Sequence, residues 1–275
     1  MSYAAEISRA NPGCVLFVID QSGSMADKLE EGTKADVVAT TLNRVLQELI
    51  IRCSKEDIYD YFDVGVIGYG HTGPVNGLSG PLANQILSPI SQVAANPARV
   101  EERVRKISDG AGGLLEVKQK FPVWFEPLAS GGTPMVAALS LAGQCLADWC
   151  DAHERSFPPV MIHLTDGEST DGNPEAVAET IKQISTDDGE VILMNAHVSG
   201  ASTREVVFPD CEDGLPDDYA RMLYRMSSVL PSSMREQARS YDFELNDRTR
   251  AFMFNAGAVE IAAFFAIGTR PSNLR

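Results

Sequence analysis

Six apolar residues, Cys-Val-Leu-Phe-Val-Ile, stand in an unbroken row at positions 14–19 and indicate which kind of sheet this chain can form. A half-exposed strand alternates apolar with polar side chains, whereas a strand buried on both faces is a continuous apolar run. The row therefore predicts a central strand of a parallel sheet with helices on both faces. It is much too short to span a membrane as a helix, which takes roughly 20 apolar residues.

Segments of helical and strand character alternate after this first strand. Apolar side chains recur at helical spacing over 33–52, and an apolar stretch at 63–69 predicts a second strand. Further strands are expected at 160–164 and 191–198, and further helices at 136–149, 174–184, 216–229 and 255–267. Alternating strands and helices predict a doubly wound, Rossmann-like α/β fold with a mostly parallel central sheet and helices on both of its faces.

The least regular part of the chain lies at about 71–130, which we interpret as an insertion. After a stretch rich in Gly, Pro and Asn, its sequence predicts a short charged helix at 98–107 and a strand at 116–125. Pro122 interrupts that strand. Because proline cannot donate a ladder hydrogen bond, we expect the strand to lie at an edge of the sheet, in antiparallel pairing.

The length of 275 residues fits one domain, which we assign to residues 1–275 with a core at about 13–269. The chain carries 23 basic and 38 acidic residues, and because such a surface repels phosphate backbones we expect no nucleic-acid partner. No targeting segment is visible, and Asn255 and Glu260 interrupt the apolar stretch 251–269, which we interpret as a buried helix, so no membrane partner is expected. The five cysteines show no CxxC pairing and indicate reduced thiols in a cytoplasmic protein.

Oxygen-bearing side chains lie in three loops that we expect at one edge of the sheet. The first strand ends in Asp20-Gln-Ser22-Gly-Ser24, a later strand is followed by Asp166-Gly, and Thr133 lies between them in a Gly-Gly-Thr-Pro loop. Ligands of open α/β sheets bind beyond the carboxyl ends of the strands, so these oxygens are expected to converge. Carboxylate and hydroxyl oxygens suit Mg²⁺ or Mn²⁺. Since only two of these donors are charged, a bound metal would stay electron-poor and accept a partner's carboxylate.

The combination, in this order along the chain, resembles the metal-ion-dependent adhesion site (MIDAS) of von Willebrand factor type A (VWA) domains, and cytosolic bacterial members are the nearest in style. The resemblance covers most of the chain. It implies that Asp20, Ser22 and Ser24 hold Mg²⁺ (or Mn²⁺, with Ca²⁺ a weaker candidate). Thr133 would bind the metal when a ligand is engaged, and Asp166 directly or through water. The implied function is non-enzymatic: an Asp or Glu of a partner protein completes the metal's coordination, and engagement can couple to a shift of the C-terminal helix.

The resemblance also implies a kind of partner. Bacterial members of the family often act beside an ATPase, a kinase or a phosphatase, so we expect such a protein, encoded nearby, in a stress or signalling complex. Loops on a rigid scaffold usually carry recognition. Two regions are therefore candidates for specificity: the rim of the metal site, with Asp27 and the loop 168–173, and the insertion 71–130. In the insertion, Trp124 and Phe125 are candidates for exposed contact residues, although Trp124 is expected to be half-buried against the sheet.

Each candidate ligand also has a purely structural interpretation. Asp20 could cap the next element, and Ser22 and Ser24 could be turn residues. Thr133 before a proline has the pattern of a helix N-cap, and Asp166 before a glycine has the pattern of a tight turn. Only the conjunction of the three loops favours a metal site over these interpretations.

Residues beside this set have two open interpretations. Glu168 and Asp171 either orient waters on the metal or belong to a solvated acidic loop. The four histidines are scattered, with His163 inside a predicted strand and His197 near a strand end. Since no two have a zinc-ligand spacing, we interpret each as a core or surface residue rather than a metal ligand.

Enzyme signatures are weak. The P-loop pattern, the dinucleotide fingerprint and the GxSxG elbow are absent. The best enzymatic alternative is a Mg²⁺-dependent phosphohydrolase of the haloacid dehalogenase type, which also has an Asp after the first strand. That class needs a second Asp two residues later as acid and base, and this chain has Ser22 there. A scaffold with a vestigial metal site is the third interpretation.

Overall fold

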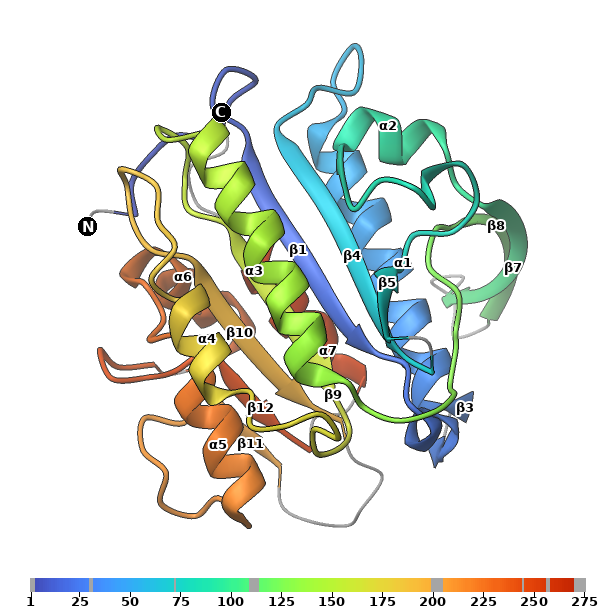
Figure 1. Ribbon diagram of the computed structural model, residues 1–275. Helices are drawn as coiled ribbons and strands as arrows, with labels where there is room; N and C mark the ends of the chain where they lie inside the picture. Colours follow the sequence, from blue (N-terminus) through green and yellow to red (C-terminus); the bar gives the residue numbers. More distant parts are fainter. Residues whose placement is uncertain are drawn as a thin grey trace.

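The computed structural model describes residues 3–29, 32–71, 73–108, 114–198, 205–243, 245–255 and 258–269 of the chain. Within them, the central sheet has eight strands (Figure 1). Seven lie in the order β11 (Val206–Val207), β12 (Phe252–Phe254), β10 (Ile192–His197), β9 (Val160–Thr165), β1 (Gly13–Asp20), β4 (Phe62–Gly70) and β5 (Gly73–Asn76), and β6 (Leu87–Pro89) also pairs with β4.

The pairing is parallel in the centre of the sheet and antiparallel at its two edges. β1 pairs in parallel with β4 and β9, and β10 pairs in parallel with β9 and β12. β5 and β6 run antiparallel to β4, and β11 runs antiparallel to β12. The mostly parallel, doubly wound sheet predicted from the sequence is therefore confirmed.

Helices cover both faces of this sheet (Figure 1). One face carries α1 (Lys34–Cys53), α2 (Ile90–Ala95), α6 (Ser232–Ala238) and α7 (Ala258–Gly268), and the other carries α3 (Met135–Ala152), α4 (Glu175–Ile181) and α5 (Asp218–Met226). All eight residues of β1 are buried. Its side chains alternate between the two cores, since Phe17 and Ile19 pack with α1 and α7 whereas Leu16 and Val18 pack with α3 and α5.

Short elements connect these layers. They are the 3-10 turns η1 (Gly23–Ala26), η2 (Gly80–Leu82) and η3 (Arg239–Tyr241) and the small hairpin of β2 (Lys28–Leu29) and β3 (Gly32–Thr33). The hairpin leads directly into α1, whose first turn is closed by a capping box: the Thr33 hydroxyl accepts from the Asp36 amide and the Asp36 carboxylate accepts from the Thr33 amide. α1 is therefore held firmly next to the loop that follows β1.

The prediction of a short charged helix at 98–107 is wrong. That segment is the strand β7 (Arg99–Ser108), which pairs antiparallel with β8 (Leu114–Val123) in a separate two-stranded sheet. The spacing of Val100 and Val104 fits one stripe of a helix and equally one face of a strand. Both valines are exposed, at 54% and 58%, so they do not form an apolar stripe that packs against the core. The hydrogen-bonded pairing with β8 therefore makes this segment a strand. The strand expected at 116–125 exists, but it pairs with β7 and not with the central sheet.

Trp124 and Phe125 are not exposed contact residues, and Trp124 is not half-buried, because each is only 2% exposed. The Trp124 indole donates to the Val93 carbonyl at 2.6 Å. On α1, the Asn43 carbonyl oxygen accepts from the amides of Trp124 and Phe125 at 2.8 and 3.1 Å, and the Asn43 amide donates to the Phe125 carbonyl at 2.9 Å. One buried asparagine thus fastens this extended segment of the insertion to α1, where its aromatic rings join the core.

The C-terminal stretch 251–269 is not one buried helix, as the sequence led us to expect. It contains the short strand β12 and then α7, which begins at Ala258 rather than at the expected 255; residues 256–257 lie outside the described residues. β12 has three residues, too few to show a period of its own beside an apolar helix. Within the described part of the chain, none of the helices combines the length and the apolar character needed to cross a bilayer. The single-domain boundaries at 1–275 stay a prediction.

Candidate metal centre

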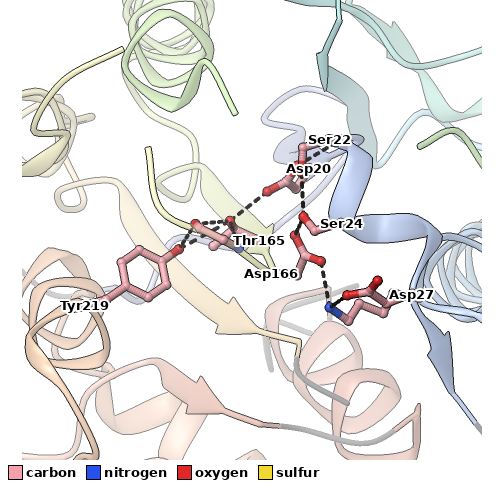
Figure 2. Close-up of polar contacts among 9 residues, drawn as sticks. Asp20, Ser22, Ser24, Asp27, Thr165, Asp166 and Tyr219 are labelled. Carbon is pink, nitrogen blue, oxygen red and sulfur yellow. Dashed lines mark hydrogen bonds and ion pairs between the residues drawn. The ribbon is translucent and has the colours of Figure 1, made fainter. Parts of the chain in front are cut away.

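The two candidate carboxylates lie side by side because their strands do. β1 and β9 are parallel neighbours, with Ile19 opposite Leu164, so both strands end at the same edge of the sheet. Asp20 is the last residue of β1, and Asp166 directly follows β9. Figure 2 shows both side chains at this edge together with Ser22 and Ser24.

The third loop is brought to the first by backbone hydrogen bonds. The Ser130 amide donates to the Gln21 carbonyl at 2.7 Å, and the Gly23 amide donates to the Gly131 carbonyl at 2.9 Å. This close approach needs glycine at position 70, where an added Cβ would lie 2.7 Å from the Gln21 carbonyl oxygen. The loop that carries Thr133 is therefore docked on the loop that carries the two serines.

Asp20 is a fully buried carboxylate. One of its oxygens accepts from the Ser22 amide and the other from the Thr165 hydroxyl, both at 2.8 Å. Burial raises the pKa of Asp20 to about 6, against the lowering effect of its hydrogen bonds with Ser22 and Thr165. Among the described residues, no cationic side chain contacts this carboxylate. A buried anion without a positive partner is costly, and a metal ion would stabilise it.

The two serines connect Asp20's loop to Asp166. The Ser22 and Ser24 hydroxyls lie 3.1 Å apart, and the Ser24 hydroxyl donates to Asp166 at 2.7 Å (Figure 2). The other Asp166 oxygen accepts from the Lys34 ammonium at 2.8 Å. Ser22 is buried and Ser24 is exposed, so this chain of oxygens runs from the interior to the surface.

Thr133 is 6% exposed, and its backbone is fixed by Thr170, whose hydroxyl accepts from the Thr133 amide at 3.0 Å. Among the described residues, the Thr133 hydroxyl has no hydrogen-bond partner. An atom in the Cβ position of Gly167 would lie 3.9 Å from the Thr133 hydroxyl oxygen and 3.8 Å from that of Ser24. The two hydroxyls therefore flank the turn after Asp166, and all five sequence-predicted residues lie in one region.

The interpretation of Thr133 as a helix N-cap is wrong. α3 begins at Met135, and the residue at its N-cap position is Pro134. The free amides of Val136 and Ala137 are instead satisfied by the Asp171 carboxylate, which accepts from each at 2.9 Å. Asp171 is thus a capping residue that reaches over from another loop, and the Thr133 hydroxyl is left available for a ligand.

The capping interpretation of Asp20 is wrong, because the N-cap residue of η1 is Ser22, and Asp20 makes a local turn contact instead. Its contact with the Ser22 amide, two residues later, is the side-chain contact of an Asx turn. That contact occupies one lone pair, and a carboxylate offers about four acceptor sites. The turn therefore presents Asp20 toward the two serines without exhausting its capacity to bind a cation. Glu168 is exposed in the other loop, two residues after Asp166.

Sequence reasoning missed Tyr219 and Lys34. The Tyr219 hydroxyl, from α5, bonds with the Gly167 carbonyl and lies 3.3 Å from the Thr165 hydroxyl (Figure 2). It supports the backbone that carries Asp166. Lys34 is the first residue of α1 and contacts both Asp166 and Asp27. Neither residue has a local sequence signal, because each reaches the site from an element that is distant along the chain.

The donor set fits a hard divalent cation. All its side chains offer oxygen, two as carboxylates and three as hydroxyls, which is the ligand type that Mg²⁺ and Mn²⁺ prefer. In the part of the chain that the structure describes, no three His, Cys, Asp or Glu side chains gather as a metal site, so a sulfur- or nitrogen-rich zinc cage has no support there.

Thr133→Val and Asp171→Asn are expected to have opposite effects. Valine keeps the shape of threonine and removes a hydroxyl that has no hydrogen-bond partner among the described residues, so stability should change by less than about 0.5 kcal/mol while Mg²⁺ affinity falls. Asp171→Asn weakens a two-amide cap and should cost about 1 kcal/mol with Mg²⁺ affinity kept. Urea unfolding and Mg²⁺ titration of both variants test this. A loss of stability in Thr133→Val equal to that in Asp171→Asn would restore the capping role of Thr133.

Acidification is expected to weaken the fold through His163, which lies fully buried in β9. Its ring nitrogens lie 2.8 Å from the Tyr69 hydroxyl and 2.8 Å from the Asn195 carbonyl oxygen. Burial lowers the pKa of His163 from 6.5 to about 4, so the fold favours the neutral ring. The stability that the fold gains from the neutral ring is present above about pH 6.5 and is lost as the pH falls towards about 4.

The size of this effect is up to about 3 kcal/mol, since one pKa unit corresponds to about 1.4 kcal/mol. Urea unfolding across this pH window measures it. Carboxylates also titrate there, so His163→Gln is the reference, and its stability should depend less steeply on pH than that of the wild type. Parallel profiles would contradict the prediction.

Comparisons with known proteins give the fold its relatives. No family model and no curated protein matches the chain. Among solved structures, the pilus adhesin SpaC from Lactobacillus rhamnosus GG has 16% identity and a TM-score of 0.52, over 96% of this chain and 31% of the adhesin. Proximal thread matrix protein 1 from the mussel byssus, with a zinc-occupied MIDAS motif, has 11% identity and a TM-score of 0.50, over 98% of this chain and 50% of that protein.

The chain thus spans half or less of the length of these two proteins. At such identities the likeness concerns the fold. Together with the strand order and the helices on both faces, it confirms the VWA-like, Rossmann-like α/β architecture predicted from the sequence.

Proposed function

We propose that this chain is a non-enzymatic interaction module that binds a divalent metal ion, Mg²⁺ in the first place and Mn²⁺ as the alternative. Asp20, Ser22, Ser24, Thr133 and Asp166 would hold the ion, and an Asp or Glu of a partner protein would complete its coordination. The observation that carries the proposal is the Asp20 carboxylate, which is fully buried, has no cationic contact among the described residues and is followed by two hydroxyls.

The residues of the site determine what such an ion would do. A bound Mg²⁺ supplies positive charge and an open coordination position. Ser22, Ser24 and Thr133 are neutral donors, so they orient the ion without cancelling its charge. Gly167 adds no side chain between the Ser24 and Thr133 hydroxyls, and Ser24 is exposed, so a partner's carboxylate can approach from that side. The similar matrix protein holds zinc at a MIDAS motif, which supports this assignment.

The geometry disfavours the phosphohydrolase alternative. Its acid and base would stand two residues after Asp20, where the Ser22 hydroxyl contacts the Ser24 hydroxyl at 3.1 Å. A hydroxyl cannot take over the proton transfers of a carboxylate near neutral pH. The second carboxylate of the site, Asp166, is held by Ser24 and Lys34. Recognition therefore fits the site better than hydrolysis does.

The partner and the location are part of the same proposal. We propose a protein partner with an exposed acidic residue, such as an ATPase, kinase or phosphatase encoded nearby in a bacterial stress or signalling complex. Nucleic acid and membrane are not expected partners of a chain with a formal charge of −15. All five cysteines are free thiols, which supports the cytoplasm and, with it, Mg²⁺ as the metal.

Titration calorimetry of the metal-stripped protein with Mg²⁺ and Mn²⁺ tests the proposal. One-site saturable binding is the expected result. The control variant Asp218→Asn should bind the metal as the wild type does, because the Asp218 side chain is fully exposed and lies outside the site. The titration is repeated with acetate as a stand-in for the partner's carboxylate. Absence of binding under both conditions would favour the interpretation as a scaffold with a vestigial metal site. Mg²⁺-dependent turnover of p-nitrophenyl phosphate would favour the phosphohydrolase interpretation.

A further inference from the structure

A buried lysine lies beside the candidate metal centre. Lys34 is 6% exposed, and no other Lys or Arg is buried among the residues whose burial the structure describes. Its ammonium contacts the Asp166 carboxylate at 2.8 Å and the Asp27 carboxylate at 3.1 Å; these contacts are the dashed lines that end on Asp166 and Asp27 in Figure 2. The Asp166 side chain is 0% exposed and that of Asp27 is 67% exposed. The Lys34–Asp166 pair is thus the one withheld from water.

The position of Lys34 is unfavourable for stability. It is the first residue of α1, at the end of the helix where the macrodipole is positive and where acidic residues are normally favoured. Burying an ammonium also costs desolvation energy. A long polar side chain at this position could reach water, yet this one is directed onto Asp166. Such an arrangement indicates a role at the site rather than in the helix.

Backbone contacts hold the lysine in place. The Lys34 amide donates to the Asp27 carbonyl at 3.0 Å, and the preceding Thr33 forms the capping box of α1. The direction from which the ammonium approaches Asp166 is therefore set by the β2–β3 hairpin and by the start of α1. Asp166 is contacted on one oxygen by Ser24 and on the other by Lys34.

The charges of this group lead to the inference, which rests on the proposed function. Asp20 and Asp166 alone would cancel the charge of a divalent cation. We propose that Lys34 is a resident counter-charge of the metal centre: its ammonium neutralises Asp166, so that the loaded site keeps a net positive charge and selects an anionic partner group. Asp27 offsets this charge only weakly, because its carboxylate is largely solvated.

The counter-charge has two measurable consequences. It lowers the affinity of the site for the metal ion, because a positive charge lies close to the cation. It also strengthens the binding of a carboxylate to the loaded site. A purely structural lysine would have the opposite effect on the metal, since its loss would release Asp166 and lower the metal affinity. The sign of the change therefore separates the two roles.

The test compares the Mg²⁺ affinity of wild type and Lys34→Met, with and without acetate. Methionine keeps the length and apolar stem of lysine and removes the charge. Lys34→Met is expected to bind Mg²⁺ about tenfold more tightly, and acetate should raise the apparent Mg²⁺ affinity of the wild type more than that of the variant. Lys34→Arg keeps the charge and should resemble the wild type. Lys28→Met, at an exposed lysine of β2, is the matched control and should change nothing.

Lys34→Gln serves in place of the methionine variant if that variant does not fold, because glutamine can still donate to Asp166 without the charge. Equal or weaker Mg²⁺ binding by the folded charge-free variant would overturn the role of Lys34 and leave the metal site in place. No Mg²⁺ binding by the wild type would overturn the metal site and the role of Lys34 together.

Discussion

Asp20→Ala is expected to lower the Mg²⁺ affinity by a factor of at least about 100 and to keep the fold. Asp20 is the carboxylate that the cation needs most, since it is fully buried and has no positive partner among the described residues. Burial raises the pKa of Asp20 to about 6, so its ionised form weakens the metal-free fold at neutral pH. Its removal relieves this cost and leaves the Ser22 amide without its acceptor, whereas the Thr165 hydroxyl keeps the Gly167 carbonyl as an acceptor at 3.0 Å. These effects on stability oppose each other, so we expect little net change.

Thermal unfolding with and without Mg²⁺ measures both parts of this prediction. A ligand that binds only the folded state raises the midpoint of unfolding. The wild type should therefore gain stability with Mg²⁺, whereas Asp20→Ala should not. Asp188→Ala is a matched control, because Asp188 is also a buried carboxylate, 8% exposed, and accepts from the amides of Ala4 and Ala5 away from the site. An equal Mg²⁺ response of Asp20→Ala and wild type would mean that the cation binds elsewhere.

Trp124→Ala is expected to lower the free energy of unfolding by about 3–5 kcal/mol. The indole is 2% exposed in the core with α1, and its removal would leave a large cavity. The Val93 carbonyl would also lose the donor that now lies 2.6 Å away. The insertion at 71–130 would then be loosened where it is fastened to α1.

Urea unfolding of Trp124→Ala beside Leu128→Ala measures this effect. Leu128 lies close by along the chain and is 55% exposed, so its truncation should change stability by less than about 0.5 kcal/mol. A loss below about 1 kcal/mol for Trp124→Ala would show that the insertion packs independently of the core, and would return Trp124 to the candidates for partner contact.

The central sheet and the placement of the five candidate ligands were predictable from the sequence. The unbroken apolar row of β1 required burial on both faces, and burial on both faces required helices on both sides. Because parallel neighbours end at the same edge, Asp20 and Asp166 had to lie close together once β1 and β9 were neighbours. That these residues hold a metal stays a prediction.

Only the tertiary structure decided which interactions the isolated segments make. Val100 and Val104 fit a helix or a strand equally well, and pairing with β8 selected the strand. Asp171 took over the helix cap expected of Thr133, since its loop lies against the start of α3. Lys34 carries no local sign of a site, because its partner Asp166 is 132 residues away. The sequence by itself determined the features that depend on periodicity and strand order, namely the central sheet and the edge at which the candidate ligands lie. Contacts between distant segments decided the strand β7, the cap of α3 and the position of Lys34. No local sequence pattern contains the energies of such contacts.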